Sequence, residues 1–77
     1  MVTVYSLPNC VQCNATMRQM DKLGIDYRIE SAADNMENLK SRGYQSAPVV
    51  RVKSDGHEDW WSGFNPAKIK NLTSVLA

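Results

Sequence analysis

The sequence predicts a small α/β domain in the order β-α-β-α-β-β-α, with a mixed four-stranded sheet and three helices. Between residues 2 and 30, a strand-like run, a helix-like run and a second strand-like run follow one another, so the two strands should be parallel. Near the middle of the chain, two further strand-like runs meet at Asp55-Gly56, a dipeptide typical of antiparallel hairpins. Two more amphipathic runs complete the set of helices.

The length of 77 residues predicts one domain covering residues 1–77. The formal net charge of +1 offers no basic surface for nucleic acid or for a membrane. No apolar run approaches the roughly 20 residues of a transmembrane helix, and no leader-like segment precedes the first strand. We therefore expect a cytoplasmic protein that binds neither nucleic acid nor membranes.

The first strand is expected at Val2–Ser6, which is rich in β-branched and aromatic residues. Leu7-Pro8-Asn9 ends it, and residues 11–23 then have a helical pattern with one inward face. The residues of that face are Cys13, Thr16, Met17, Met20 and Leu23. Gly24 is expected to end the helix as its C-terminal cap.

A second strand is expected at residues 25–30, where apolar and polar residues alternate. Residues 31–42 predict a short amphipathic helix, capped by Asp34 and ended by Gly43. Its apolar positions are Met36 and Leu39, and its charges form a solvent-exposed face of Glu37, Lys40 and Arg42.

A third strand is expected at residues 47–52, with Pro48 at its start because proline cannot donate to the ladder. Residues 53–56 predict the hairpin turn, and residues 57–61 return as an antiparallel strand. Neighbouring residues of a strand point to opposite faces, so one residue of the pair Trp60-Trp61 should face inward and the other outward.

The last helix is expected to begin at Asn65-Pro66, a favoured N-cap followed by proline at the first helical position. Its periodic positions share one face. They are Ile69, Leu72, Thr73 and Leu76.

The two cysteines of the chain, Cys10 and Cys13, stand at the junction of the first strand and the first helix. This spacing at this position is typical of a redox-active dithiol. The free N–H groups and positive end of the helix stabilise a thiolate at Cys10, and Cys13 lies one turn later, within reach of a disulfide. We therefore expect Cys10 to attack and Cys13 to resolve. Since the sequence neighbours of Cys10 are uncharged, a moderately lowered pKa of its thiol is expected.

Two other roles for the pair remain open from the residues alone. A structural disulfide is less favoured, because closing so short a loop constrains the unfolded chain little. Half of a metal site is the stronger alternative, with zinc or an iron–sulfur cluster shared between two chains. The chain has no second cysteine pair and His57 is its single histidine, so we assign no metal ligand and expect no cofactor beyond the pair itself.

Three segments of the chain carry a family resemblance. They are Cys10-Val11-Gln12-Cys13 followed by Asn14-Ala15-Thr16, Gly43-Tyr44 ahead of Ala47-Pro48-Val49-Val50, and Trp61-Ser62-Gly63-Phe64 with Pro66 after it. In this order they resemble the NrdH redoxins, which have the thioredoxin fold in its compact, glutaredoxin-like form. The resemblance implies a thiol–disulfide oxidoreductase that carries electrons from NADPH and thioredoxin reductase to class Ib ribonucleotide reductase. A monomer is expected, since such a carrier docks with two partners in turn.

The resemblance also implies roles for individual residues. Cys10 and Cys13 match the redox pair, and Pro48 matches a cis-proline that faces the disulfide and leaves the adjacent backbone free to pair with a partner peptide. The segment from Trp61 to Phe64 is associated with packing near the site and with choosing the reductase. The partner-binding residues expected on this basis are Val11, Gln12, Ala47, Pro48, Trp61, Ser62, Gly63 and Phe64. Asn65 departs from the family, which usually carries Arg or Gln there.

A glutathione-dependent glutaredoxin is the alternative within the same fold. Such proteins typically carry Cys-Pro-Tyr-Cys and a later Gly-Gly-x-Asp segment that binds glutathione. This chain has Val11-Gln12 between its cysteines and Ser62-Gly63-Phe64-Asn65 at the later position. The expected glutathione-binding segment is therefore missing.

Overall fold

A four-stranded mixed sheet with strand order β2-β1-β3-β4 forms the centre of the protein, seen in a computed structural model that describes residues 1–75. Its strands are β1 (Val2–Ser6), β2 (Arg28–Ser31), β3 (Val49–Ser54) and β4 (His57–Ser62). The helices of the described residues are α1 (Val11–Lys22), α2 (Met36–Ser41) and α3 (Pro66–Val75). As predicted, β1 and β2 are parallel and β3 pairs antiparallel with both β1 and β4. The α/β class and the thioredoxin-fold element order are confirmed.

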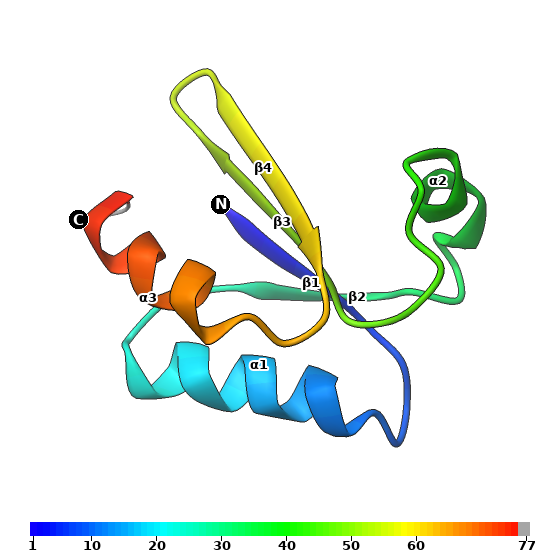
Figure 1. The fold of residues 1–77 in the computed structure, drawn as a ribbon, viewed down its shortest axis with the longest axis horizontal. Helices are drawn as coiled ribbons and strands as arrows, with labels where there is room; N and C mark the ends of the chain where they lie inside the picture. The colour runs from blue at the N-terminus through cyan, green and yellow to red at the C-terminus, as the bar shows by residue number, and fades with distance from the viewer. Residues whose placement is uncertain (76–77) are drawn as a thin grey trace.

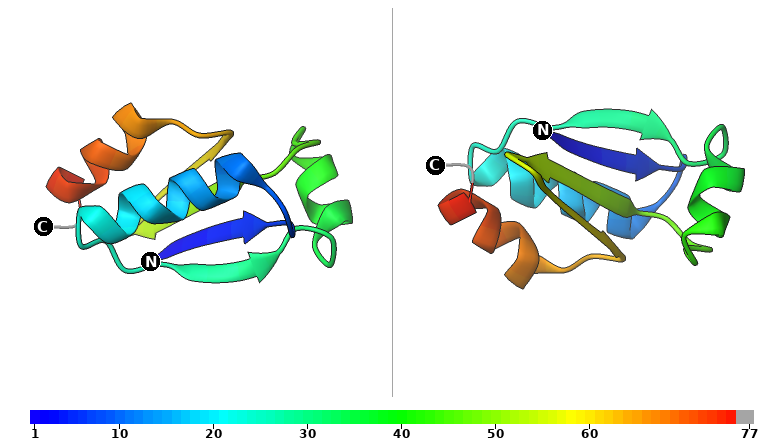
Figure 2. Two further views of the ribbon diagram at one scale, coloured as in Figure 1. Left: turned by 90° about the horizontal axis from the view of Figure 1, so that it is seen from below. Right: turned by 90° about the horizontal axis from the view of Figure 1, so that it is seen from above.

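The helices are divided between the two sides of the sheet. Helices α1 and α3 lie together on one face (Figure 1), whereas α2 lies apart from them near the end where β2 finishes (Figure 2). The core between the sheet, α1 and α3 is built from Val2, Val4, Met20, Ile25, Val50, Val52, Trp61, Ile69 and Leu72. Within residues 1–75, no helix has the length and apolar character needed to cross a membrane.

Helix α1 follows its predicted pattern closely. Cys13, Thr16 and Met20 are fully buried on the inward face. The helix ends at Lys22, and Gly24 takes a positive φ of 70°, which glycine adopts without a steric penalty. The chain then folds back, so that the backbone N–H of Ile25 donates to the carbonyl of Met20 at 2.9 Å.

The next two elements are shorter than predicted. The N–H of Ile25 and the hydroxyl of Tyr27 bond back to α1, and β2 starts at Arg28 rather than at residue 25. Helix α2 covers Met36–Ser41, because the preceding residues form a turn in which the Ser31 hydroxyl accepts the N–H of Asp34 at 3.2 Å. The N-cap is Asn35, so the predicted cap at Asp34 is wrong.

The hairpin between β3 and β4 is tighter than predicted. Its turn consists of Asp55 and Gly56, both with positive φ, and Lys53 and Ser54 still pair with residues of β4. Two consecutive positive φ values suit a two-residue turn whose twist matches the strands. The four-residue turn predicted from the sequence is therefore corrected to two residues.

The two tryptophans lie on opposite faces of β4. Trp61 is 6% exposed in the core under α1 and α3. Trp60 lies on the other face of the sheet, as strand alternation predicted, but its ring is not left open to solvent. It packs on the second face of the sheet, where Tyr5, Ala32, Leu39 and Val49 form another buried cluster. Both faces of the sheet therefore carry a hydrophobic core.

Helix α3 begins at Pro66, as predicted. The Asn65 side chain accepts the N–H of Lys68 at 3.2 Å and so caps the helix. Ile69 and Leu72 are buried, whereas Thr73, which was predicted to share their face, is exposed. Leu76 lies outside the described residues.

Candidate functional site

Cys10 and Cys13 are joined by a disulfide at the start of α1, with their Cα atoms 5.2 Å apart. Cys10 is the N-cap of the helix and is half-buried, whereas Cys13 is fully buried. An incoming thiolate can therefore approach the sulfur of Cys10 but not that of Cys13. A disulfide placed this way can accept two electrons through attack at Cys10.

The surroundings of Cys10 favour negative charge on its sulfur. The backbone N–H of Cys13 points to Sγ of Cys10 at 3.1 Å, and the positive end of the α1 dipole lies at the same place. The first turn of α1 carries no acidic residue that would oppose a thiolate. Asn9, in a left-handed conformation with φ of 58°, turns the chain from β1 into this position.

The Ala47–Pro48 peptide bond is cis, as the family resemblance implied. Pro48 is fully buried immediately before β3, and Ala47 is half-buried beside it. The carbonyl of Pro48 accepts the backbone N–H of Gly63 at 2.9 Å. The Pro48 carbonyl is therefore already hydrogen-bonded within the chain. It is not free to pair with a partner peptide, unlike the backbone that the resemblance led us to expect beside this proline.

Gln12 connects the redox turn to the loop that follows β4. Its side-chain oxygen Oε1 accepts the backbone N–H of Phe64 at 3.3 Å, across 52 positions of sequence. The neighbouring Gly63 has a φ of 81° and is the residue that bonds Pro48. Three segments distant in sequence are thus joined by two hydrogen bonds, one at Gln12 and one at Pro48.

The residues expected to bind a partner separate into exposed and buried ones. Val11 is 81% exposed and Phe64 is 40% exposed, which places two large apolar side chains at this end of the molecule. Ser62 is exposed at the end of β4, while Trp61 lies in the core. The Trp61 ring therefore packs in the core and is not presented to a partner.

Two contributions at this site escaped the reasoning from sequence. Gln12 was expected to face a partner, but it bonds the chain's own backbone, and no local pattern reveals a contact between residues 52 positions apart. Asn65 departs from the residue usual in the family and had no role beyond a favoured N-cap. In the structure its side chain caps α3. The preference of asparagine for N-caps was the available signal.

The described residues show no metal centre within one chain. In residues 1–75, no group of three or more histidine, cysteine, aspartate or glutamate side chains is arranged to hold a metal ion. His57 starts β4, at the opposite end of that strand from Ser62 and the loop that Gln12 contacts. The histidine is therefore placed away from the cysteine pair.

Comparison with known proteins agrees with this geometry. Residues 2–57 match the family model described as Glutaredoxin. The glutaredoxin-like protein NrdH of Salmonella typhimurium (strain LT2) is 34% identical over 74 residues, covering 92% of this chain and 86% of that protein. The glutaredoxin-like protein NrdH of Lactococcus lactis subsp. cremoris is 32% identical over 75 residues, covering 94% and 99% respectively.

The solved structure of NrdH-redoxin from Escherichia coli, a protein described as having a thioredoxin-like activity profile, is also similar. It matches with a TM-score of 0.80 and 35% identity, covering 92% of each chain. Thioredoxin from Fasciola hepatica matches with a TM-score of 0.69 at 19% identity, over 96% of this chain and 77% of that one, which supports the fold alone. The chain therefore belongs to the glutaredoxin family and, within it, to the NrdH redoxins of the thioredoxin fold.

Proposed function

We propose that this chain is a dithiol electron carrier that takes electrons from NADPH through thioredoxin reductase and delivers them to class Ib ribonucleotide reductase. The observation that carries the proposal is the disulfide between a half-buried Cys10 and a fully buried Cys13 at the start of α1. The thioredoxin-like activity profile of the similar Escherichia coli protein supports a thioredoxin-type reductant.

Delivery of electrons proceeds by thiol–disulfide exchange. The Cys10 thiolate of the reduced protein attacks one sulfur of the target disulfide, forms a mixed disulfide and releases the other target sulfur as a thiolate. Cys13 then loses its proton and attacks Sγ of Cys10. The Cys10–Cys13 disulfide forms, and the second target sulfur leaves as a thiolate that takes up a proton. Two electrons pass to the target, and the redoxin dithiol is oxidised.

Docking of both partners is proposed to use the apolar end of the molecule. Val11 adjoins Cys10 in sequence, and Phe64 is held to the same turn by Gln12. Together with Ala47, Ser62 and Gly63 they form the proposed contact surface, and the buried Pro48 supports it by accepting the N–H of Gly63. The cysteine pair is proposed to be the sole redox group, so that a monomer without a bound cofactor performs the cycle.

Two parallel reductions test the choice of reductant. The oxidised protein is mixed with NADPH and thioredoxin reductase in one, and with NADPH, glutathione and glutathione reductase in the other. The proposal expects rapid NADPH consumption with thioredoxin reductase and slow consumption with glutathione. The reverse result would contradict it.

A glutathione-dependent glutaredoxin is the second candidate, because residues 2–57 match the general glutaredoxin model. A metal- or cluster-carrying dimer that shares the two cysteine pairs is the third. Metal analysis of protein purified without oxygen distinguishes the third candidate from the other two. Stoichiometric zinc or iron that blocks the thiols would contradict the carrier proposal.

A further inference from the structure

Strand β2 has one side of its backbone open at the edge of the sheet. Among the strands of residues 1–75 it pairs with β1 alone, and Figure 2 shows no helix of this part of the chain along its outer side. Arg28, Ile29 and Glu30 are exposed, and the large apolar side chain of Ile29 belongs to a residue that is 61% exposed. An open edge of this kind can pair with the strand of another chain.

The backbone groups that face outward from β2 are those of Ile29 and Ser31. The N–H of Ala32 donates to the carbonyl of Ser6 in β1 at 3.0 Å, so the backbone groups of Ala32 point toward β1. Because these groups alternate in direction along a strand, those of Ile29 and Ser31 point away from β1. The N–H and the carbonyl of Ile29 are therefore both open to a second strand.

The side chains of β2 have a charge pattern that is complementary to itself. Arg28 and Glu30 flank Ile29 in sequence and lie on the same face of the strand. Within residues 1–75, neither of them takes part in an ion pair. If two copies of β2 pair antiparallel about Ile29, Arg28 of each copy lies opposite the partner's Glu30. The two Ile29 residues then lie opposite each other, as two-fold symmetry requires.

This register satisfies the backbone as well as the charges. Two outward-facing residues that lie directly opposite each other in an antiparallel pair exchange both of their backbone hydrogen bonds, and the Ile29 pair would do so. A register centred on Arg28 or on Glu30 would instead place two like charges opposite each other, which is unfavourable. An edge protected against pairing typically carries charges such as lysine, whereas this edge carries one charge of each sign on either side of an apolar residue.

We propose that β2 is a self-association surface, through which two copies of this chain pair antiparallel about Ile29 and join their sheets. Since β2 has only four residues, the contact is small and the dimer forms reversibly at high protein concentration. This inference goes beyond the proposed function. Ser62, which belongs to the proposed contact surface, ends β4 at the opposite edge of the sheet, so each copy can still perform the redox cycle.

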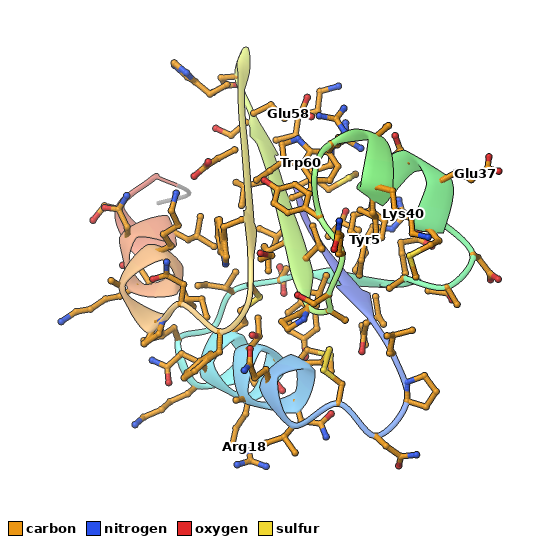
Figure 3. The ribbon with its side chains drawn as sticks, turned by 45° about the vertical axis from the view of Figure 1, so that its right-hand side comes forward. Tyr5, Arg18, Glu37, Lys40, Glu58 and Trp60 are labelled. Carbon is orange, nitrogen blue, oxygen red and sulfur yellow. A yellow bond between two sulfur atoms is a disulfide. The ribbon has the colours of Figure 1, made fainter. Side chains whose placement is uncertain are left out.

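Charge reversal on β2 tests the proposal, with sedimentation equilibrium as the measurement. The average mass of the wild-type protein should rise with concentration. Arg28→Glu and Glu30→Arg each turn two attractive pairs into two repulsive ones, so each should weaken association about tenfold. Arg18→Glu and Glu37→Arg are the matched controls, because they make the same changes of charge at exposed positions of α1 and α2 (Figure 3). Both controls should associate like the wild type.

A mixture of the two β2 variants tests the register itself. In a mixed pair of Arg28→Glu with Glu30→Arg, both pairs of opposite charges are restored, so the mixture should associate about as tightly as the wild type. A mixture of Arg28→Glu with Glu37→Arg has the same net charges but restores only one pair, so it should associate more weakly. NMR titration of isotope-labelled Arg28→Glu measures both affinities and should show the Ile29 amide signal moving.

Two outcomes would overturn the proposal. One is a wild-type protein that stays monomeric at the concentrations used for NMR. The other is a mixture of Arg28→Glu with Glu30→Arg that associates no more tightly than either variant alone.

Discussion

The indole N–H of Trp60 donates a hydrogen bond of 2.6 Å to the carboxylate of Glu58, two residues earlier on the same face of β4. Figure 3 shows the two side chains close together, with Tyr5 beside the indole. The Trp60 ring stacks on Tyr5 and on Tyr44, with centroid distances of 6.0 and 6.2 Å. The guanidinium of Arg42, the residue after α2, lies 4.1 Å from the Trp60 ring centroid. Trp60 therefore links the end of α2 to the sheet.

This hydrogen bond makes the cluster sensitive to acid. The bond from Trp60, followed by the charges of Arg51 and Arg42, lowers the pKa of Glu58 below its usual 4.5. A carboxyl whose pKa is lowered by folding stabilises the protein above its unfolded pKa, and that contribution is lost as the pH falls through the folded pKa. We expect the Trp60 indole N–H signal in NMR to move below about pH 4.5 and not in Glu58→Gln. An identical pH response in both proteins would contradict this assignment.

Replacing Trp60 should weaken the second face of the sheet. Trp60→Leu removes two aromatic contacts and the Arg42 cation–π contact, so the free energy of unfolding should fall by about 1–3 kcal/mol. Denaturant unfolding measures the change. Glu37→Gln serves as the control, because Glu37 is exposed on α2 and points away from Trp60 in Figure 3. Equal stability of Trp60→Leu and the control would show that the cluster contributes nothing.

Removing the buried cysteine should trap the intermediate of the exchange reaction. In Cys13→Ser, Cys10 can still attack a disulfide, but no second thiol resolves the mixed disulfide. Mass spectrometry after incubation with a disulfide substrate should show a stable adduct on Cys10. Cys10→Ser should give far less adduct, because Cys13 is fully buried. A stronger adduct in Cys10→Ser than in Cys13→Ser would reverse the assigned roles.

Gly63 is expected to matter for its backbone conformation. Its φ is 81°, and a Cβ there would meet Gln12 only at an ordinary contact distance of 3.5 Å, so the cost of Gly63→Ala is mainly strain of about 1–2 kcal/mol. Gly43→Ala is a matched control, with a φ of 88° and nothing within 4 Å of its Cβ position. Both should lose similar stability.

The two glycine variants should differ in activity. Gly63→Ala disturbs the hydrogen bonds to Pro48 and Gln12, so its reduction by thioredoxin reductase should slow several-fold more than that of Gly43→Ala. Initial rates under conditions where both variants remain folded give the comparison. Equal rates would mean that the loop after β4 does not influence partner choice.

The sequence predicted the elements whose signals are local. The periodic face of α1, the Gly24 cap and the Asn65-Pro66 start of α3 depend on residues within one or two turns. The cysteine pair was likewise a local signal. The predicted length of α2 was too great, because the Ser31 hydroxyl accepts the backbone N–H of Asp34 and holds the preceding residues in a turn.

What the sequence could not provide were contacts between distant segments. Strand alternation placed Trp60 opposite Trp61, but it did not reveal that Arg42 and Tyr44 would cover Trp60. In the same way, Gln12 had no pattern linking it to Phe64. Such contacts depend on how the sheet brings its strands and loops together, which local periodicity does not encode.

The most direct test is reconstitution of deoxyribonucleotide synthesis from NADPH, thioredoxin reductase, this protein and a class Ib ribonucleotide reductase. The proposed function predicts that product formation depends on the added protein and disappears when Cys10→Ser replaces it. Failure to form product, although thioredoxin reductase reduces the protein rapidly, would contradict delivery to ribonucleotide reductase.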